Sequence, residues 1–343
     1  MHVNLQAPAW ATAIASDLTD MDRAAEPLEP GAELDYELPD DVYFQYAWVD
    51  DSGKLRPDPD CPERTTSVWY GEVSEIFGPS YRPDPLAADT ANGAGQGGGA
   101  TERLKIEPAA GTAADAPAWR VTVVSPPGDY DELPLVIAQD GVAFLRIGRP
   151  HLIAAELTSR GEARPARFAF IEPHNRNREY GLLEPDSASY QRFLAEKLEP
   201  ELVQRFPTSA ERIYLGASLG AAASARAALK AVEDDPTRAP DTTVLAFSGA
   251  FLGAPGDSDY YASRRSWLRE RLEDRLVATP ARWHLEVGNL EWLLDVNREV
   301  AKALRVLPDV EVSLNERSAG HNWTNWRNGL ASALKFALAP ETG

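Results

Sequence analysis

The sequence predicts an α/β protein in which a mostly parallel sheet carries helices on both faces, with a small β-rich domain before it. Three observations lead to this prediction. Strand-like and helix-like segments alternate from residue 103 onward, which is typical of parallel strands joined by crossover helices. The apolar run at 133–139 is typical of a strand buried on both faces. Aromatic and small residues alternate at 41–50, as they do in a half-buried strand of a β domain.

Changes in composition divide the chain of 343 residues into four parts. Residues 1–33 are acidic and rich in proline and alanine, and we expect an N-terminal tail. Residues 34–85 are expected to form the β domain. Residues 86–101 include the stretch NGAGQGGGA, which has little side chain to bury and predicts a flexible linker. Residues 102–343 are expected to form the α/β domain.

The expected elements follow from periodicity and turn signals. In the β domain we expect strands at 41–50 and 67–73. In the α/β domain, 103–108 and 119–127 are expected to pair as a hairpin. Further strands are expected at 133–141, 167–173, 211–217, 242–249, 282–288 and 309–316. Helices are expected at 189–206, 219–232, 264–276 and 292–307, with a last helix after the final strand.

Composition also limits the possible partners. Acidic residues outnumber basic ones 53 to 34, and the net charge of −19 argues against a nucleic-acid binder, which needs clustered cations. The sequence has neither a membrane-length apolar run nor a signal-peptide pattern at its start, so we expect a cytoplasmic protein with no membrane partner. The single Cys61 can form neither an internal disulfide nor a structural zinc site alone. We expect no metal and no cofactor, and the sequence does not indicate an oligomeric state.

The segment RIYLGASLGAAASARAALKA contains the pattern G-x-S-x-G, centred on Ser218. A strand-like run precedes the pattern and an alanine-rich helix follows it, which is the strand–turn–helix setting of a nucleophile elbow. Gly216 and Gly220 leave room for the tight turn and for close packing of the helix. A serine at this place lies at the carboxyl edge of the sheet, where a helix N-terminus favours developing negative charge. The structural alternative is an ordinary N-capping serine.

A serine nucleophile needs a base, and chain order in an α/β-hydrolase is nucleophile, acid, histidine. Of the five histidines, His321 lies on a loop after the last expected strand, which is the position of the catalytic histidine in this fold. Glu291 follows the end of strand 282–288 and its Gly288 turn, and is the preferred acid. Asp295, one helical turn later, is the alternative acid, and Glu291 could instead only support a helix N-terminus.

The oxyanion of the reaction needs two backbone N–H donors. One candidate is Leu219, directly after the serine. The other is Gly141, in the turn that follows the apolar strand LPLVIAQ.

These residues together resemble the enterochelin (ferric siderophore) esterase branch of the esterase-D-like α/β-hydrolases. The resemblance covers most of 103–338 and rests on LPLVIAQDG, FIEPHNRNRE, YLGASLGA, LEVGNLE and GHNWTNWRNGL. The last segment, the histidine loop, is the most specific match and includes Trp326. YFQYAWVDDSGKLRPDPDCP resembles the immunoglobulin-like early-set module, a β-sandwich-like domain that precedes such hydrolase domains.

The resemblance implies a serine esterase that cleaves the lactone scaffold of a catecholate siderophore. Ser218 would attack the ester, His321 would transfer the proton and Glu291 would orient the imidazole. Arg176 and Trp326 are the candidate substrate contacts, although Arg176 could instead be a surface or ion-pair arginine. Two alternatives stay open at this point. One is an acyl-carbohydrate or general carboxylesterase of the same mechanism, and the other is a binding protein on a hydrolase scaffold that does not catalyse.

Overall fold

The structure is a computed structural model that divides the chain into two compact units. The β unit comprises Met1–Pro83, Val287–Leu294 and Glu316–Asn328, and the α/β unit comprises Asp84–Glu286, Asp295–Asn315 and Gly329–Gly343. Each unit is described by itself. The residues that the structure describes are 1–91, 99–109, 117–182, 184, 186–254, 257, 263, 265–273 and 278–340.

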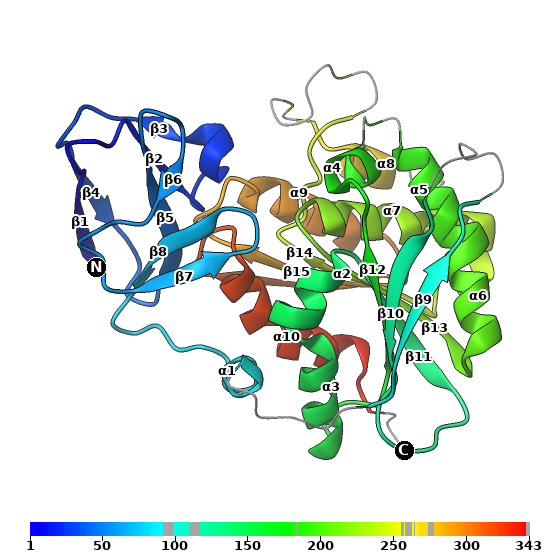
Figure 1. Cartoon of the computed structure of the whole chain (residues 1–343). Helices are drawn as coiled ribbons and strands as arrows, with labels where there is room; N and C mark the ends of the chain where they lie inside the picture. The colour runs from blue at the N-terminus through cyan, green and yellow to red at the C-terminus, as the bar shows by residue number, and fades with distance from the viewer. Residues whose placement is uncertain are drawn as a thin grey trace. The chain divides into compact units, whose positions relative to one another are not determined.

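The β unit contains two antiparallel sheets (Figure 1). The first pairs β1 (His2–Gln6) with β4 (Glu33–Glu37). The second has the order β3-β2-β5-β8-β7, with β6 added on β5. Its strands are β2 (Ala13–Ser16), β3 (Glu26–Pro27), β5 (Tyr43–Val49), β6 (Leu55–Arg56), β7 (Arg64–Ser67) and β8 (Gly71–Phe77), and a short 3-10 helix, Met21–Ala24, follows β2.

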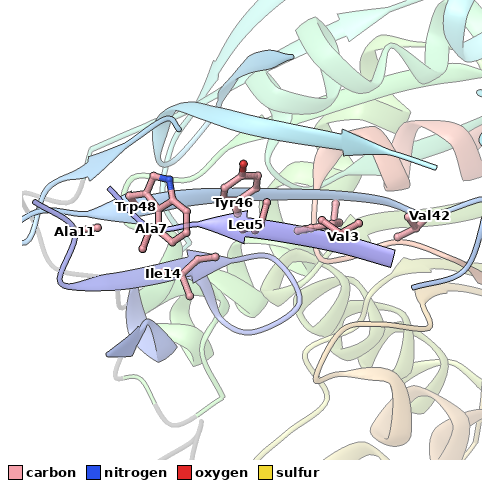
Figure 2. Close-up of a cluster of buried hydrophobic side chains, with 9 residues drawn as sticks. Val3, Leu5, Ala7, Ala11, Ile14, Val42, Tyr46 and Trp48 are labelled. Atoms are coloured by element: carbon pink, nitrogen blue, oxygen red, sulfur yellow. The ribbon is translucent and has the colours of Figure 1, made fainter. Parts of the chain in front are cut away.

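Apolar side chains from both sheets form the core of the β unit (Figure 2). Val3 and Leu5 come from β1, Ile14 comes from β2, and Tyr46 and Trp48 come from β5. All five are at most 7% exposed. Because alternate residues of a strand face the same side, β1 with its pattern of exposed and buried residues can cover the other sheet. The two sheets therefore form the small sandwich that the sequence predicts.

Two expectations for this unit are wrong in detail. Residues 1–33 are not a tail, because they supply β1, β2 and β3 and part of the core. Their acidic, proline-rich composition hides the alternation of apolar residues that buries one face of β1. The expected single strand at 67–73 is a hairpin, since the chain turns between β7 and β8 and Gly71 adopts a φ of 77°.

The α/β unit is built on a sheet of eight strands in the order β16-β15-β14-β13-β11-β12-β10-β9. From β15 to β12 the neighbouring strands are parallel, whereas β9 and β10 are antiparallel and form the expected hairpin. The strands are β9 (Thr101–Ile106), β10 (Trp119–Val124), β11 (Leu133–Ala138), β12 (Arg167–Glu172), β13 (Thr208–Ala217), β14 (Thr242–Phe247), β15 (Arg282–Gly288) and β16 (Glu311–Arg317).

Helices cover this sheet on both faces, with α3 and α10 on one side and α6 and α7 on the other (Figure 1). Every residue of β11 and β14 is buried, as a strand between two helical layers requires. The helices are α1 (Pro85–Ala91), α2 (Gly141–Ala143), α3 (Pro150–Ser159), α4 (Arg176–Tyr180), α5 (Ser187–Phe193), α6 (Glu199–Arg205), α7 (Leu219–Asp234), α8 (Trp267–Glu273), α9 (Leu294–Arg305) and α10 (Trp323–Ala337).

The expected linker and domain boundary differ from the structure in two ways, and one part of the linker is not tested. The start of the expected linker is helical, because α1 occupies Pro85–Ala91. Its glycine-rich part, 92–98, lies outside the described residues. The range 102–343 is also not one unit, since the segments that follow β15 and β16 belong to the β unit. Among the described residues, no helix is both long and apolar enough to cross a membrane.

Candidate active site

Ser218 lies on a sharp turn between β13 and α7. Its backbone has a φ of 56° and a ψ of −124°, a conformation that residues other than glycine rarely adopt. The turn is fixed from both sides, because the Ser218 N–H donates to Phe247 O at 2.8 Å and the Ala250 N–H donates to Ser218 O at 3.1 Å. Within this described turn, the Ser218 side chain makes no capping hydrogen bond to α7. The geometry is therefore that of a nucleophile elbow and not that of a capping serine.

The two glycines of the pattern are required by close approach at this turn. A Cβ on Gly216 would lie 2.2 Å from Gly220 O, and a Cβ on Gly220 would lie 2.8 Å from Asp140 Oδ2. At Gly216 the neighbouring atom belongs to the backbone, so a side chain there would displace the turn, whereas a side chain at Gly220 would displace the Asp140 carboxylate. The alanines of the first helical turn are fully buried, which lets α7 pack closely against β13 and β14.

The Asp140–Gly141 turn, which follows β11, lies beside the N-terminus of α7. Asp140 adopts a left-handed φ of 52°, and a Cβ on Gly141 would come within 2.6 Å of the backbone of Phe170 and Ile171. Gly141 therefore marks a place where two stretches of backbone touch. This turn and Leu219 both belong to the α/β unit, at the edge of the sheet where β11 and β13 end.

Arg176 holds this turn. Its guanidinium donates to Asp140 Oδ1 from Nε at 2.8 Å and to Oδ2 from Nη2 at 3.0 Å, and Nη2 also donates to Ala217 O at 3.2 Å. The hydroxyl oxygen of Tyr180 accepts from the Asp140 N–H at 3.0 Å. A two-pronged arginine–carboxylate pair is geometrically specific, so these contacts fix the turn that carries Gly141. The structure shows Arg176 in this ion pair, and its contact with a substrate stays a prediction.

His321 and Glu291 form a buried pair inside the β unit. His321 Nδ1 contacts Glu291 Oε2, and Glu291 Oε1 accepts from the Gly288 N–H at 2.8 Å. The Glu291 side chain is 0% exposed, whereas Asp295 is exposed in the first turn of α9. With Nδ1 engaged by the carboxylate, Nε2 is the nitrogen that could accept a proton from a nucleophile. Within the β unit the structure thus places Glu291 at the histidine.

Aromatic rings surround His321 within the β unit. The Trp292 ring lies 4.6 Å from the imidazole, and the Trp326 ring lies 4.9 Å from it at a nearly perpendicular angle. Trp69, in the turn between β7 and β8, contacts Trp326 edge-on at 5.8 Å and is 39% exposed. Trp326 itself is 1% exposed, so its ring packs on the histidine inside the β unit, whereas the Trp69 side chain is partly open to solvent.

The other histidines occupy structural positions. His284 is buried in β15 and contacts Glu286 at 3.1 Å. His2 lies in β1 beside Glu37 and not in a tail, and His151 lies in the first turn of α3. His174 pairs with the buried Glu179 in the α/β unit.

Sequence reasoning missed four residues that shape the candidate site. Trp292 directly follows Glu291 in the sequence, and this adjacency was an available signal. Trp69 lies in the middle of the strand expected at 67–73, although Gly71 marks a turn there. Asp17 and Tyr180 had no usable sequence signal, because each acts through contacts to residues far away along the chain.

Comparison with known proteins shows the family to which the chain belongs. A family model described as "Putative esterase" matches residues 118–337, which is more than half of the chain. No curated protein sequence gives a significant match.

Several solved structures resemble the chain at low sequence identity. The ferric enterobactin esterase of Salmonella typhimurium is 17% identical, with a TM-score of 0.70 over 98% of this chain and 93% of that one. The enterobactin esterase of Shigella flexneri is 17% identical, with a TM-score of 0.67 over 97% and 91% of the two chains. A ferulic acid esterase is 19% identical, with a TM-score of 0.51 over 70% of this chain and 96% of that one. These similarities confirm the α/β-hydrolase fold.

We predict that Arg176→Met lowers kcat for p-nitrophenyl acetate by about 10- to 100-fold with little change in KM. The substitution frees Asp140 and loosens the turn that carries Gly141, and a displaced oxyanion donor costs transition-state stabilisation. Steady-state kinetics separate this role from direct substrate binding, which would raise KM and spare kcat. The matched control is Arg178→Met on the same helix, where the arginine pairs with an exposed Asp186 and kcat should not change.

We predict that Glu291→Gln lowers kcat by about 10³-fold or more, because an amide cannot stabilise the imidazolium or fix its tautomer. Asp295→Asn is the matched control and should leave kcat within about twofold, since Asp295 is an exposed first-turn residue. The reverse result in a kinetic comparison of the two variants would show that Asp295 is the acid.

Proposed function

The chain belongs to the Esterase family of carboxylic ester hydrolases, and we propose that it cleaves its substrate through Ser218, His321 and Glu291. The observation that carries this proposal is the backbone of Ser218, whose positive φ holds a hydroxyl at the strand–helix turn. Strain of this kind persists only where the surroundings impose it, and it is concentrated at functional sites. The buried Glu291–His321 pair supports the assignment of the base and the acid.

The order of the strands also supports this triad. β13, β14 and β15 are neighbouring parallel strands, so their carboxyl ends meet at one edge of the sheet. Ser218 directly follows β13, Glu291 follows the last residue of β15 by three positions, and His321 follows β16. This is the chain order of an α/β-hydrolase triad.

The proposed reaction has two steps. In the first, Ser218 Oγ attacks the ester carbonyl while His321 Nε2 takes the hydroxyl proton, and the N–H groups of Gly141 and Leu219 stabilise the oxyanion. The intermediate collapses to an acyl-serine and the departing alkoxide takes the proton from His321. In the second step, His321 deprotonates a water molecule, which attacks the acyl-serine. The bond between the acyl group and Ser218 Oγ then breaks, and His321 returns the proton to Oγ, which releases the carboxylic acid and restores the free serine.

For the substrate, we propose an ester of the siderophore type, the lactone scaffold that carries dihydroxybenzoyl groups. Both enterobactin esterases match this chain over more than nine-tenths of its length, and the match therefore includes the β unit. The ferulic acid esterase matches only 70% of it. Within the β unit, the exposed ring of Trp69 and the part-exposed ring of Trp292 offer flat apolar surfaces suited to aromatic groups of such a substrate.

We predict that Ser218→Ala removes hydrolysis of p-nitrophenyl acetate almost completely, by about 10⁴-fold or more in kcat, while the far-UV circular dichroism stays unchanged. The alanine has no oxygen to form the acyl intermediate. The matched control is Ser224→Ala, a buried serine on the same helix, which should keep kcat near the parent value. A Ser218→Ala protein that still turned over at the parent rate would refute the mechanism.

We predict that kcat/KM for a ferric trilactone of dihydroxybenzoyl-serine exceeds that for acetylated or feruloylated sugars by at least about tenfold. Chromatographic measurement of the released acids gives both values. Faster cleavage of the sugar esters would assign the enzyme to acyl-carbohydrates.

In the same assay, Trp69→Ala should raise KM for the trilactone several-fold, because the substitution removes an aromatic stacking surface. The turnover of p-nitrophenyl acetate should stay unchanged.

A further inference from the structure

Asp17, the residue after β2, lies directly beneath the histidine loop. Its backbone carbonyl accepts from the His321 N–H at 2.8 Å. Its carboxylate Oδ2 accepts from the Asn322 side-chain amide at 2.6 Å and from the Gln45 N–H at 2.9 Å. Asp17 is 1% exposed, so these bonds are made away from water. One residue of the N-terminal sandwich thus binds the backbone of the base and the side chain next to it.

Strand β5 contacts the same loop along its backbone. The Tyr43 N–H donates to Ser318 O at 2.8 Å and the Gly320 N–H donates to Tyr43 O at 3.3 Å, so Tyr43 pairs with Ala319 as in a short parallel ladder. A Cβ on Gly320 would lie 2.1 Å from Asp17 Oδ1. The loop therefore approaches the sandwich as closely as glycine allows.

The turn that carries the acid is held by the same unit. Leu290, next to Glu291, packs against the core cluster that contains Trp48. The Asn289 N–H donates to Arg317 O at 2.7 Å, and a Cβ on Gly288 would lie 2.2 Å from Ala319 O. The acid turn and the histidine loop are therefore bound to each other and to the sandwich.

We propose that Asp17 is a positioning residue for His321, and that the N-terminal sandwich serves the reaction by holding the base and its acid in register. This proposal rests on the proposed triad. The sandwich is then a part of the catalytic apparatus and not only an accessory binding module. A shift of about 1 Å in a catalytic group can cost about 100-fold in rate. The hydrogen bonds that Asp17 accepts from the His321 N–H and from the Asn322 side chain are therefore able to affect turnover.

The raised pKa of Asp17 is consistent with a residue that positions His321 through hydrogen bonds. Burial raises the pKa of the Asp17 carboxyl well above its usual range, and the nearby charge of Glu291 raises it further. A raised pKa favours the neutral form of the Asp17 carboxyl, which carries no second negative charge close to Glu291. Asparagine has the shape of a protonated aspartate and can make the same contacts.

The test compares Asp17→Ala, Asp17→Asn and Asn322→Ala in the full chain, with p-nitrophenyl acetate as substrate. We expect Asp17→Ala to lower kcat about 10- to 100-fold and Asn322→Ala about 10-fold, each with KM within about twofold of the parent. Asp17→Asn should keep kcat within about threefold. Near-UV circular dichroism and thermal unfolding measure how much of each variant is folded.

Asp50→Ala is the matched control. Asp50 is a buried carboxylate of the same sandwich, but it accepts hydrogen bonds from Ser52, Lys54 and Arg56 in its own turn. Its loss should lower the unfolding temperature and leave kcat of the folded protein unchanged. If Asp50→Ala lowered kcat as much as Asp17→Ala does, the loss of activity would be explained by general destabilisation of the β unit, and the proposal would be overturned.

Other outcomes separate this proposal from the triad itself. Parent-like kcat in both folded Asp17→Ala and folded Asn322→Ala, with inactive Ser218→Ala and Glu291→Gln, would overturn the positioning role and leave the triad intact. If Asp17→Ala does not fold, Asn322→Ala removes the same hydrogen bond from the other side and decides the question. Parent-like activity in Ser218→Ala would remove the basis of both proposals.

Discussion

The backbone conformation of Ser218 is the constraint on which the rest of the α/β unit depends. An L-residue with a φ of 56° and a ψ of −124° is strained, and about 1–3 kcal/mol must come from its surroundings. The hydrogen bonds to Phe247 and Ala250 hold the turn, and glycines at 216 and 220 let the helix approach the strand. The strain is useful because it places the hydroxyl at the end of β13, at the N-terminus of a helix.

The same close packing explains the neighbouring ion pair. Since Gly220 has no side chain, the Asp140 carboxylate can lie against the start of α7, and Arg176 neutralises it from the other side. A buried carboxylate without this partner would carry a large desolvation cost. Its negative charge would also oppose an oxyanion forming at Gly141 and Leu219. The arginine thus fixes the position of the turn and compensates the charge beside it.

Patterns local in the sequence predicted much of the fold and of the candidate site. The apolar runs of β11 and β14, the elbow around Ser218 and the glycine turn before Glu291 each lie within a few residues, and the structure places all of them as expected. Asp17 could not be predicted in this way, because its proposed role depends on a hydrogen bond to Asn322, which lies 305 positions away in the sequence. The hairpin at Trp69 was missed because aromatic and β-branched residues mask the turn that Gly71 makes.

The loops that carry Glu291 and His321 belong to the β unit, whose residues bind their backbone groups. The segments after β15 and β16 leave the sheet as loops, and loops are the least rigid parts of a fold. In the β unit their backbone groups find partners in Tyr43 and Asp17, and Leu290 enters an apolar core. Each contact replaces water around a loop with a fixed neighbour, which reduces the number of conformations that His321 and Glu291 can adopt. An enzyme that relies on the orientation of an imidazole gains rate from this restriction, even where the supporting residue never touches the substrate.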